Sequence, residues 1–212
     1  MRRKLYLLFT ALFALSAVRP FCTSALSFPF QFVTVAPGDH SEVFIMAPHG
    51  RKDDLPHGAC YSFDEAGKAR IVWSVKGWYS YPGCLFLAPN GDMLARIVSY
   101  SGKRPQGDSP LLEFYLKGKM HRRILTKEII KHPEKVVPSS FPGPQIYEFF
   151  WRGAFPKLVA YGDLMEYPGF RHSDKNNIDP DYYILVFMTI ENEWFAFDLK
   201  VGSLLQRWIP PE

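Results

Sequence analysis

Short apolar runs separated by turn-forming residues are the feature that most restricts how this chain can fold. Beyond residue 25, Val, Ile, Phe, Tyr and Trp gather into runs of five to eight residues, and Gly, Pro, Asn and Asp lie between the runs. This length and composition are typical of strands. The sequence therefore predicts an all-β fold, an antiparallel meander, with a β-sandwich as the alternative. The predicted strands are Phe30–Val35, Val43–Ala47, Cys60–Asp64, Ala69–Val75, Cys84–Ala88, Met93–Tyr100, Leu112–Lys117, Met120–Leu125, Tyr147–Arg152, Tyr183–Ile190, Trp194–Asp198 and Ser203–Ile209.

Residues that accept left-handed backbone angles mark several reversals between these runs. Asn90-Gly91, Lys117-Gly118 and Asn192 each lie between two predicted strands, and Asn and Gly adopt the positive φ angles that tight hairpins require. Neighbouring strands are therefore expected to pair as antiparallel hairpins.

The predicted strands leave little room for helix. One short helix is predicted over Thr126–His132, with Thr126 as its N-cap and Pro133 ending it. Two polar or proline-rich segments, residues 136–145 and 167–182, are predicted to be irregular.

The N-terminus has the layout of an export signal. Basic residues at positions 2–4 precede an apolar run, Leu5–Val18, which is shorter than the roughly 20 residues that a membrane-spanning helix needs. Small side chains favour cleavage after Ala25. We expect residues 1–25 to be a signal peptide and residues 26–212 to form a single β-rich domain without a stable transmembrane span. The protein is accordingly expected to be exported, to the periplasm or the cell exterior.

The charge balance argues against binding to nucleic acid. The full chain carries a formal net charge of +4, and the leader contains four basic residues and no acidic ones. Residues 26–212 are therefore neutral overall, whereas a protein that binds a phosphate backbone needs a local excess of Lys and Arg. We expect no nucleic-acid partner.

Two cysteines, Cys60 and Cys84, remain beyond the leader. In an oxidising compartment such a pair most often forms a disulfide, and we expect that bond here. The alternatives are two buried thiols, or one nucleophilic cysteine assisted by a histidine.

A strand–turn–strand pattern occurs twice. An aromatic residue, a Phe-Asp pair, a Gly and a later Trp recur in the same order at Tyr61, Phe63, Asp64, Gly67 and Trp73 and at Phe195, Phe197, Asp198, Gly202 and Trp208. The aromatic residues are expected to share one face of a sheet. The Asp side chain begins the turn by accepting hydrogen bonds from nearby backbone amides, and the Gly takes the left-handed position.

The second copy, FAFDLKVGSLLQRW, resembles the blade motif of quinoprotein-type β-propeller repeats, in which a tryptophan docks against the next blade. The whole chain resembles small exported bacterial proteins of unknown function that contain such hairpins. The resemblance implies a propeller-like meander, open or incomplete, because residues 26–212 supply at most four blades. It implies no activity and no cofactor.

The loop that precedes Cys84 is the candidate binding surface. It contains Trp78, Tyr79 and Tyr81, and exposed aromatic side chains can stack on a sugar or fill a pocket of a partner. The alternative is that Trp78 and Tyr81 cap the core beneath a disulfide-tethered turn. The sequence favours this alternative, and the loop is kept as a candidate.

No spacing in the sequence assigns a metal site or a catalytic residue. Six histidines (His40, His49, His57, His121, His132 and His172) lack metal-binding spacing. The acidic segment 174–181 differs from an EF-hand loop. Gly-x-Ser-x-Gly and Ser-x-x-Lys motifs are missing from the sequence. We therefore expect no metal and no cofactor.

Two functions fit these observations. The first is an exported, non-catalytic binding or scaffold module that presents loops of a β-meander to an envelope protein or a glycan. The alternative is an extracytoplasmic hydrolase whose site is built from residues 39–57 and 170–181, where ionisable groups are dense. Because catalytic spacing is missing, the first function is the expectation.

Overall fold

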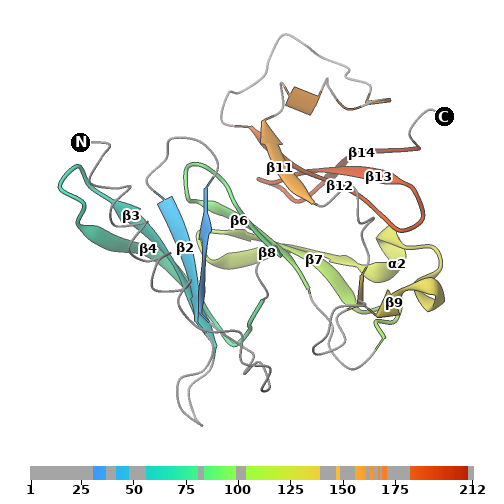
Figure 1. Ribbon diagram of the computed structural model, residues 1–212, viewed down its shortest axis with the longest axis horizontal. Helices are drawn as coiled ribbons and strands as arrows, with labels where there is room; N and C mark the ends of the chain where they lie inside the picture. The colour runs from blue at the N-terminus through green and yellow to red at the C-terminus, as the bar shows by residue number, and fades with distance from the viewer. Residues whose placement is uncertain are drawn as a thin grey trace, which may run out of the picture.

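The chain is an antiparallel all-β meander, as the sequence predicts. The computed structural model describes residues 31–36, 42–47, 56–80, 84–98, 104–138, 147–148, 156–160, 163–164, 167, 169–170 and 182–209. Within them lie three consecutive four-stranded sheets, each with its strands in chain order (Figure 1). The first sheet contains β1 (Phe32–Val35), β2 (Glu42–Ala47), β3 (His57–Phe63) and β4 (Ala69–Lys76). The second contains β5 (Leu85–Leu87), β6 (Met93–Ile97), β7 (Pro110–Leu116) and β8 (Lys119–Leu125). The third contains β11 (Lys157–Ala160), β12 (Tyr183–Met188), β13 (Trp194–Asp198) and β14 (Leu204–Trp208).

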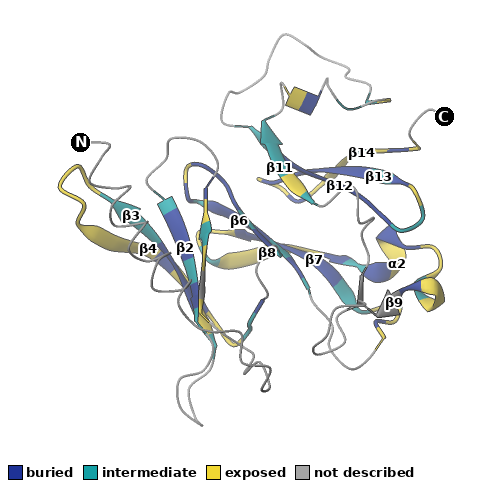
Figure 2. Cartoon of the chain, in the orientation of Figure 1, coloured by how far each residue is buried: buried dark blue, intermediate teal, exposed yellow. Residues whose placement is uncertain are grey.

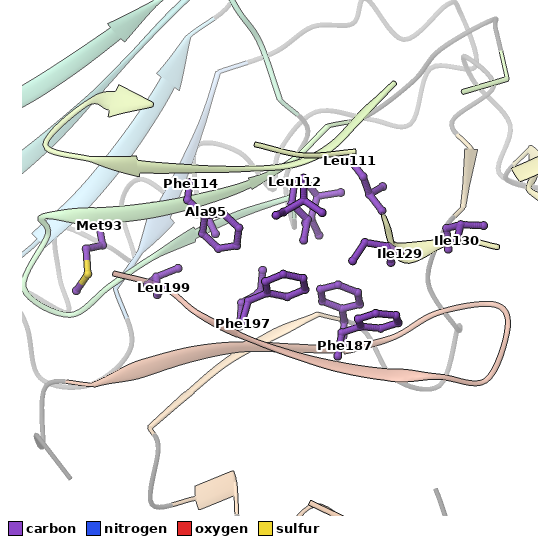
Figure 3. Close-up of a cluster of buried hydrophobic side chains, with 14 of the residues drawn as sticks. Met93, Ala95, Leu111, Leu112, Phe114, Ile129, Ile130, Phe187, Phe197 and Leu199 are labelled. Carbon is purple, nitrogen blue, oxygen red and sulfur yellow. The ribbon is translucent and has the colours of Figure 1, made fainter. Parts of the chain in front are cut away.

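Neighbouring sheets pack against one another through apolar clusters. One apolar cluster joins the first and second sheets and contains Phe44, Trp73, Leu94 and Tyr115. A second cluster joins the second and third sheets (Figure 3). Apolar side chains thus cover both faces of the second sheet, because alternate residues of a strand point to opposite faces.

The middle strands of the second and third sheets are buried, and the last strand of each sheet is largely exposed (Figure 2). In the second cluster, the rings of Phe114 and Phe197 lie 5.8 Å apart, centroid to centroid. Phe187 and Phe197 of the third sheet face Leu112 and Phe114 of the second (Figure 3). Burial of these large rings stabilises this junction.

The turn chemistry predicted for the repeated motif is confirmed in both copies. The Asp64 carboxylate accepts hydrogen bonds from the backbone amides of Ala66 and Lys68, and Gly67 has a φ of +78°. Asp198 accepts from the amides of Lys200 and Val201 in the same way, and the glycine that follows is also left-handed.

The glycines of these turns differ in what lies against them. A Cβ on Gly118, in the β7–β8 turn, would lie 2.8 Å from the Ser74 carbonyl oxygen of the first sheet. A Cβ on Gly202, in the β13–β14 turn, would lie 2.8 Å from Phe114 of the second sheet. Nothing lies within 4 Å of the same position on Gly67. The last turn of the second sheet therefore packs closely against the first sheet, and the last turn of the third sheet packs closely against the second.

The face of the third sheet that points away from the second sheet is covered by Leu164, Tyr167 and Phe170. Leu164 is buried there, and the ring of Phe170 makes an edge contact with Trp208, 5.6 Å between centroids. Gln206 of β14 donates a hydrogen bond to the Gly169 carbonyl oxygen at 3.3 Å. This segment closes one end of the stack of sheets.

Helical structure is shorter than predicted. The helix α2 covers Thr126–Ile129, and a 3-10 turn follows at Pro133–Lys135. Thr126 is not the N-cap, because its hydroxyl donates to the Ser109 carbonyl at 2.9 Å. Leu125 is the N-cap, and its amide donates to the Glu128 carboxylate at 2.7 Å.

Two strand regions differ from the prediction. β9 (Val137–Pro138) lies in a segment predicted to be irregular and pairs with β10 (Tyr147–Glu148). β11 is absent from the predicted strands, because its sequence, KLVA, is only four residues long and shows no alternation of apolar and polar residues. It gains its strand partner only from β12, far along the chain.

Candidate functional site

A cavity of about 640 Å³, which we call the junction cavity, opens where the first sheet meets the second. Its walls come from the end of β4 and the residues after it, from β6, and from the β7–β8 hairpin. The lining residues are Ser74, Val75, Lys76, Trp78, Arg96, Glu113, Tyr115, Gly118, Met120 and Arg123. This volume lies within the range of small-molecule sites in proteins.

A buried carboxylate, Glu113, lies at the centre of the wall formed by the second sheet. Its side chain is only 4% exposed. One oxygen, Oε1, accepts hydrogen bonds from Nε and Nη2 of Arg123 at 3.0 and 2.8 Å. The other, Oε2, accepts from Nη1 of Arg96 at 2.8 Å and from the Tyr115 hydroxyl at 2.7 Å. Four donors therefore fill the acceptor capacity of the carboxylate.

Strand pairing places these groups together. Arg96 on β6 and Arg123 on β8 both lie directly opposite Glu113 on the central strand β7. Tyr115 follows two residues later on the same strand and hence on the same face. Register alone thus brings two cations and a hydroxyl to one carboxylate.

The electrostatics of the cluster keep Glu113 ionised. Burial by itself would raise the pKa of Glu113, but the hydrogen bond from Tyr115 and the charges of Arg96 and Arg123 outweigh burial and hold that pKa below its ordinary value. Burial, followed by the hydrogen bond to the Glu113 carboxylate, raises the pKa of Tyr115. Tyr115 is therefore a neutral donor at physiological pH.

Arg96 also contacts Trp78 and Tyr79, in the loop that precedes Cys84. Its guanidinium carbon lies 4.2 Å from the centroid of the Trp78 ring, a cation–π contact. Its Nη2 donates to the Tyr79 carbonyl at 3.1 Å. The Arg96 Nε–H is buried and has no acceptor among the described residues. One donor of the cavity wall is therefore unsatisfied within the described protein, which is costly unless something else accepts from it.

Neither Glu113 nor Tyr115 is available to exchange a proton with a substrate. All acceptor sites of Glu113 are occupied, so none is left for a substrate proton. Its pKa is also below the ordinary value. Tyr115 holds its proton against that carboxylate. A general base needs a free acceptor and a pKa near the working pH. Neither of these two groups meets that requirement, and both act to fix the positions of the arginines.

The three residues of the predicted binding surface fall in different situations. Trp78 lines the junction cavity, half-buried, with its ring stacked near Phe44 at 6.5 Å between centroids. Tyr79 is half-buried and supplies the carbonyl that holds Arg96. Tyr81 lies outside the described residues. Trp78 therefore packs against the core and also lines the cavity, and binding by this loop stays a prediction.

The expected disulfide is not present, because Cys60 and Cys84 are both thiols in the structure. Cys60 is buried between the first and second sheets, whereas Cys84 packs at the cluster between the second and third. The two side chains thus lie on opposite sides of the second sheet. Burial, with smaller contributions from Glu42 and Asp92, raises the pKa of the Cys60 thiol to about 12. Its Sγ is 3.4 Å from the Gly91 carbonyl oxygen.

Most residues of the alternative hydrolase site lie outside the described residues. Of the segment 39–57 the structure describes 42–47 and 56–57, and of 170–181 it describes Phe170 alone. The acidic segment 174–181 and three of the histidines are likewise outside it. Among the residues that are described, no group of three or more His, Cys, Asp or Glu side chains could hold a metal ion. In the same part of the chain, no helix is long and apolar enough to cross a membrane.

Sequence reasoning misses the residues at the centre of the site, Arg96, Glu113 and Arg123. A weak indication is available, because Glu113 interrupts an apolar strand, PLLEFYL. A charged residue inside such a run requires a buried partner. Identifying the partners needs the register of three strands, which local sequence does not contain.

A second buried carboxylate provides a useful comparison. Glu193, in the β12–β13 turn, is 7% exposed and pairs with Lys131 at 2.5 Å and with Arg207. Arg207 also lies over the Phe195 ring, 5.1 Å from its centroid. None of these residues lines the junction cavity. A buried ion pair therefore does not by itself mark a binding site. Of these two buried carboxylates, Glu113 lines the junction cavity and Glu193 does not.

Comparison with known proteins identifies no relative: no family model matches the chain, and no curated protein matches it significantly.

Proposed function

We propose that this protein is an exported, non-catalytic binding module that holds a ligand in the junction cavity. One observation carries the proposal: the cavity is lined by rigidly held donors, and the only carboxylate among its described lining residues is already saturated. A site built in this way orients a ligand without offering it a base. An envelope component, a glycan or a surface protein, is the kind of partner that an exported module meets.

Export rests on the basic and apolar leader and has its own test. The intact mass of the protein, purified from the cell that makes it, is expected to correspond to residues 26–212. A full-length mass in the fraction outside the cytoplasm would contradict cleavage after Ala25. Recovery of the protein in the cytoplasmic fraction alone would contradict export.

Ligand binding in the junction cavity can be tested with a fluorescent aromatic anion, 8-anilinonaphthalene-1-sulfonate. We expect saturable binding with one site per chain. The substitution Met120→Trp should block it, because Met120 lines the cavity and is 45% exposed, so that a larger side chain fits without disturbing the core. Leu205→Trp is the matched control, since Leu205 is 40% exposed on β14 of the third sheet and is not part of the lining.

Met120→Trp is expected to lower the affinity for the probe by about tenfold or more, which corresponds to about 1.4 kcal/mol of binding free energy. Leu205→Trp is expected to leave the affinity unchanged. Equal binding by all three proteins would place the probe elsewhere and refute the proposal. The absence of saturable binding to the unmodified protein would refute it as well.

A further inference from the structure

The wall of the junction cavity carries more positive than negative charge. Arg96 and Arg123 flank a single carboxylate, Glu113, and Lys76 is an exposed lining residue. The cluster of two arginines and one glutamate therefore retains one net positive charge. Because Glu113 has no acceptor site left, this charge is available only to a group that comes from outside the cluster.

The exposed side chain of Arg123 shows where an acceptor would be bound. The Arg96 Nε–H also lacks an acceptor among the described residues, but this atom is buried and is not open to the cavity. The Arg123 side chain is 46% exposed although two of its nitrogens are held by Glu113. Nε and Nη2 of Arg123 already bind Glu113, which fixes the position of the guanidinium, so an incoming carboxylate would be held by the remaining donors of this side chain. The cluster thus offers a preorganised cation with one uncompensated positive charge, and the exposed Lys76 adds a second cation to the wall.

The remaining walls define the rest of the ligand. Val75, Trp78, Tyr115 and Met120 present apolar or aromatic surface to the cavity. The face of Trp78 toward Arg96 is occupied by the guanidinium. A volume of about 640 Å³ is far larger than a bare inorganic ion requires. The ligand is therefore expected to have a ring-sized body with an apolar side, in addition to its anionic group.

We propose that the junction cavity binds a ring-shaped organic acid through a single carboxylate group, with a uronic-acid sugar as the representative ligand. This proposal rests on the proposed function and adds the chemical class of the ligand. The carboxylate accepts hydrogen bonds from Arg123, Arg96 contributes its positive charge, and the sugar ring lies against Met120 and the edge of Trp78. A singly charged group neutralises the one charge that the Glu113 cluster leaves uncompensated.

The test is titration calorimetry of the full protein with glucuronate, with glucose and with inorganic phosphate. We expect glucuronate to bind at least about tenfold more tightly than glucose, with weakening at high salt because the interaction is ionic. Phosphate is expected to bind more weakly than glucuronate, because it cannot use the apolar wall. Phosphate binding that is equal or tighter would overturn the assignment in favour of a simple anion site.

Substitutions of Arg123 test whether its positive charge, rather than the integrity of the fold, gives the preference for glucuronate. Arg123→Gln should lose most of the preference for glucuronate over glucose, and Arg123→Lys should recover part of it. Arg70→Gln is the charge-matched control, because Arg70 is exposed on β4 and does not line the cavity. The salt dependence of the unmodified protein tests the same charge if Arg123→Gln fails to fold.

Failure of this inference is distinguishable from failure of the proposed function. Equal affinities for glucuronate and glucose, or no binding of either, would overturn the ligand class. If the naphthalene probe still binds and Met120→Trp still blocks it, the proposed function stands in that case. If the probe does not bind either, both fail together.

Discussion

The indole Nε1–H of Trp73, on β4 of the first sheet, donates a hydrogen bond to the carbonyl oxygen of Gly91 at 2.7 Å, and Gly91 lies in the β5–β6 turn of the second sheet. The tryptophan at the end of the first repeated motif therefore docks against the next sheet. The contact is buried, and the ring also lies 5.3 Å from Phe44, centroid to centroid. A single side chain thus supplies both apolar area and a directional bond to this junction.

Trp73→Phe should lower the free energy of unfolding by about 1–3 kcal/mol, because the Gly91 carbonyl loses its main donor while most of the aromatic packing is retained. The remaining contact of that oxygen is with the weakly donating Cys60 thiol at 3.4 Å. Urea denaturation followed by circular dichroism measures the change. A loss below about 0.5 kcal/mol would show that the hydrogen bond does not contribute to the junction.

Gly67 and Gly118 form a matched pair for testing how the sheets pack. Both have a φ of +78°, so alanine suffers the same backbone strain at either position, of roughly 1–2 kcal/mol. At Gly118 the new Cβ would also meet the Ser74 carbonyl oxygen at 2.8 Å, whereas around Gly67 the space is open. Gly118→Ala is therefore expected to be the more destabilising, by about 1 kcal/mol or more. Equal losses in thermal or urea unfolding would contradict the close contact between the first two sheets.

The parts of this fold that depend on interactions between nearby residues can be predicted from the sequence. The turns at Asp64 and Asp198 follow from carboxylates that bind nearby amides and from glycines with positive φ, and each of these interactions lies within a few residues. Lys117 and Gly118 likewise both have positive φ, as a two-residue hairpin requires. Such features can be recognised without knowledge of the remaining chain.

The features that could not be predicted depend on residues far apart in the sequence. Arg96, Glu113 and Arg123 meet because three strands pair in one particular register, and a shift by one residue would turn each side chain to the other face. The cysteines show the same limitation. The number of cysteines and the expected export favour a disulfide between Cys60 and Cys84, but the structure places them on opposite sides of the second sheet. Composition does not report on which side of a sheet a residue lies.

Glu113→Gln should destabilise the protein by about 3 kcal/mol at neutral pH, because it leaves Arg96 and Arg123 beside a neutral group in a largely buried cluster. The pKa of Glu113 is lower in the folded protein than its ordinary value of 4.5. The carboxylate therefore contributes its full stability above that pH, and the contribution is lost as the pH falls through the folded pKa.

The pH profile of Glu113→Gln provides its control. The difference in unfolding free energy between the unmodified protein and this variant should be constant near neutral pH and should shrink below about pH 4.5. Burial would raise the pKa of Glu193, but its cationic partners outweigh burial and lower that pKa as well. Because Glu193 titrates in both proteins, its effect cancels from the difference. A difference that does not change with pH would show that the substitution acts through packing rather than through charge.

The two thiols are expected to differ in reactivity with iodoacetamide. Cys84 is half-buried, whereas Cys60 is fully buried with a pKa of about 12, and the thiolate is the reactive form. In the folded protein Cys84 should therefore be alkylated first, and Cys60 should react only as fast as the junction between the first two sheets opens. Mass spectrometry of peptides after timed labelling measures both rates. Trp73→Phe should speed the labelling of Cys60, because it weakens that junction, and should leave the rate at Cys84 unchanged, because Cys84 packs on the other side of the second sheet. Equal acceleration at both sites would instead indicate that the sheets unfold together, with no separate opening of the junction.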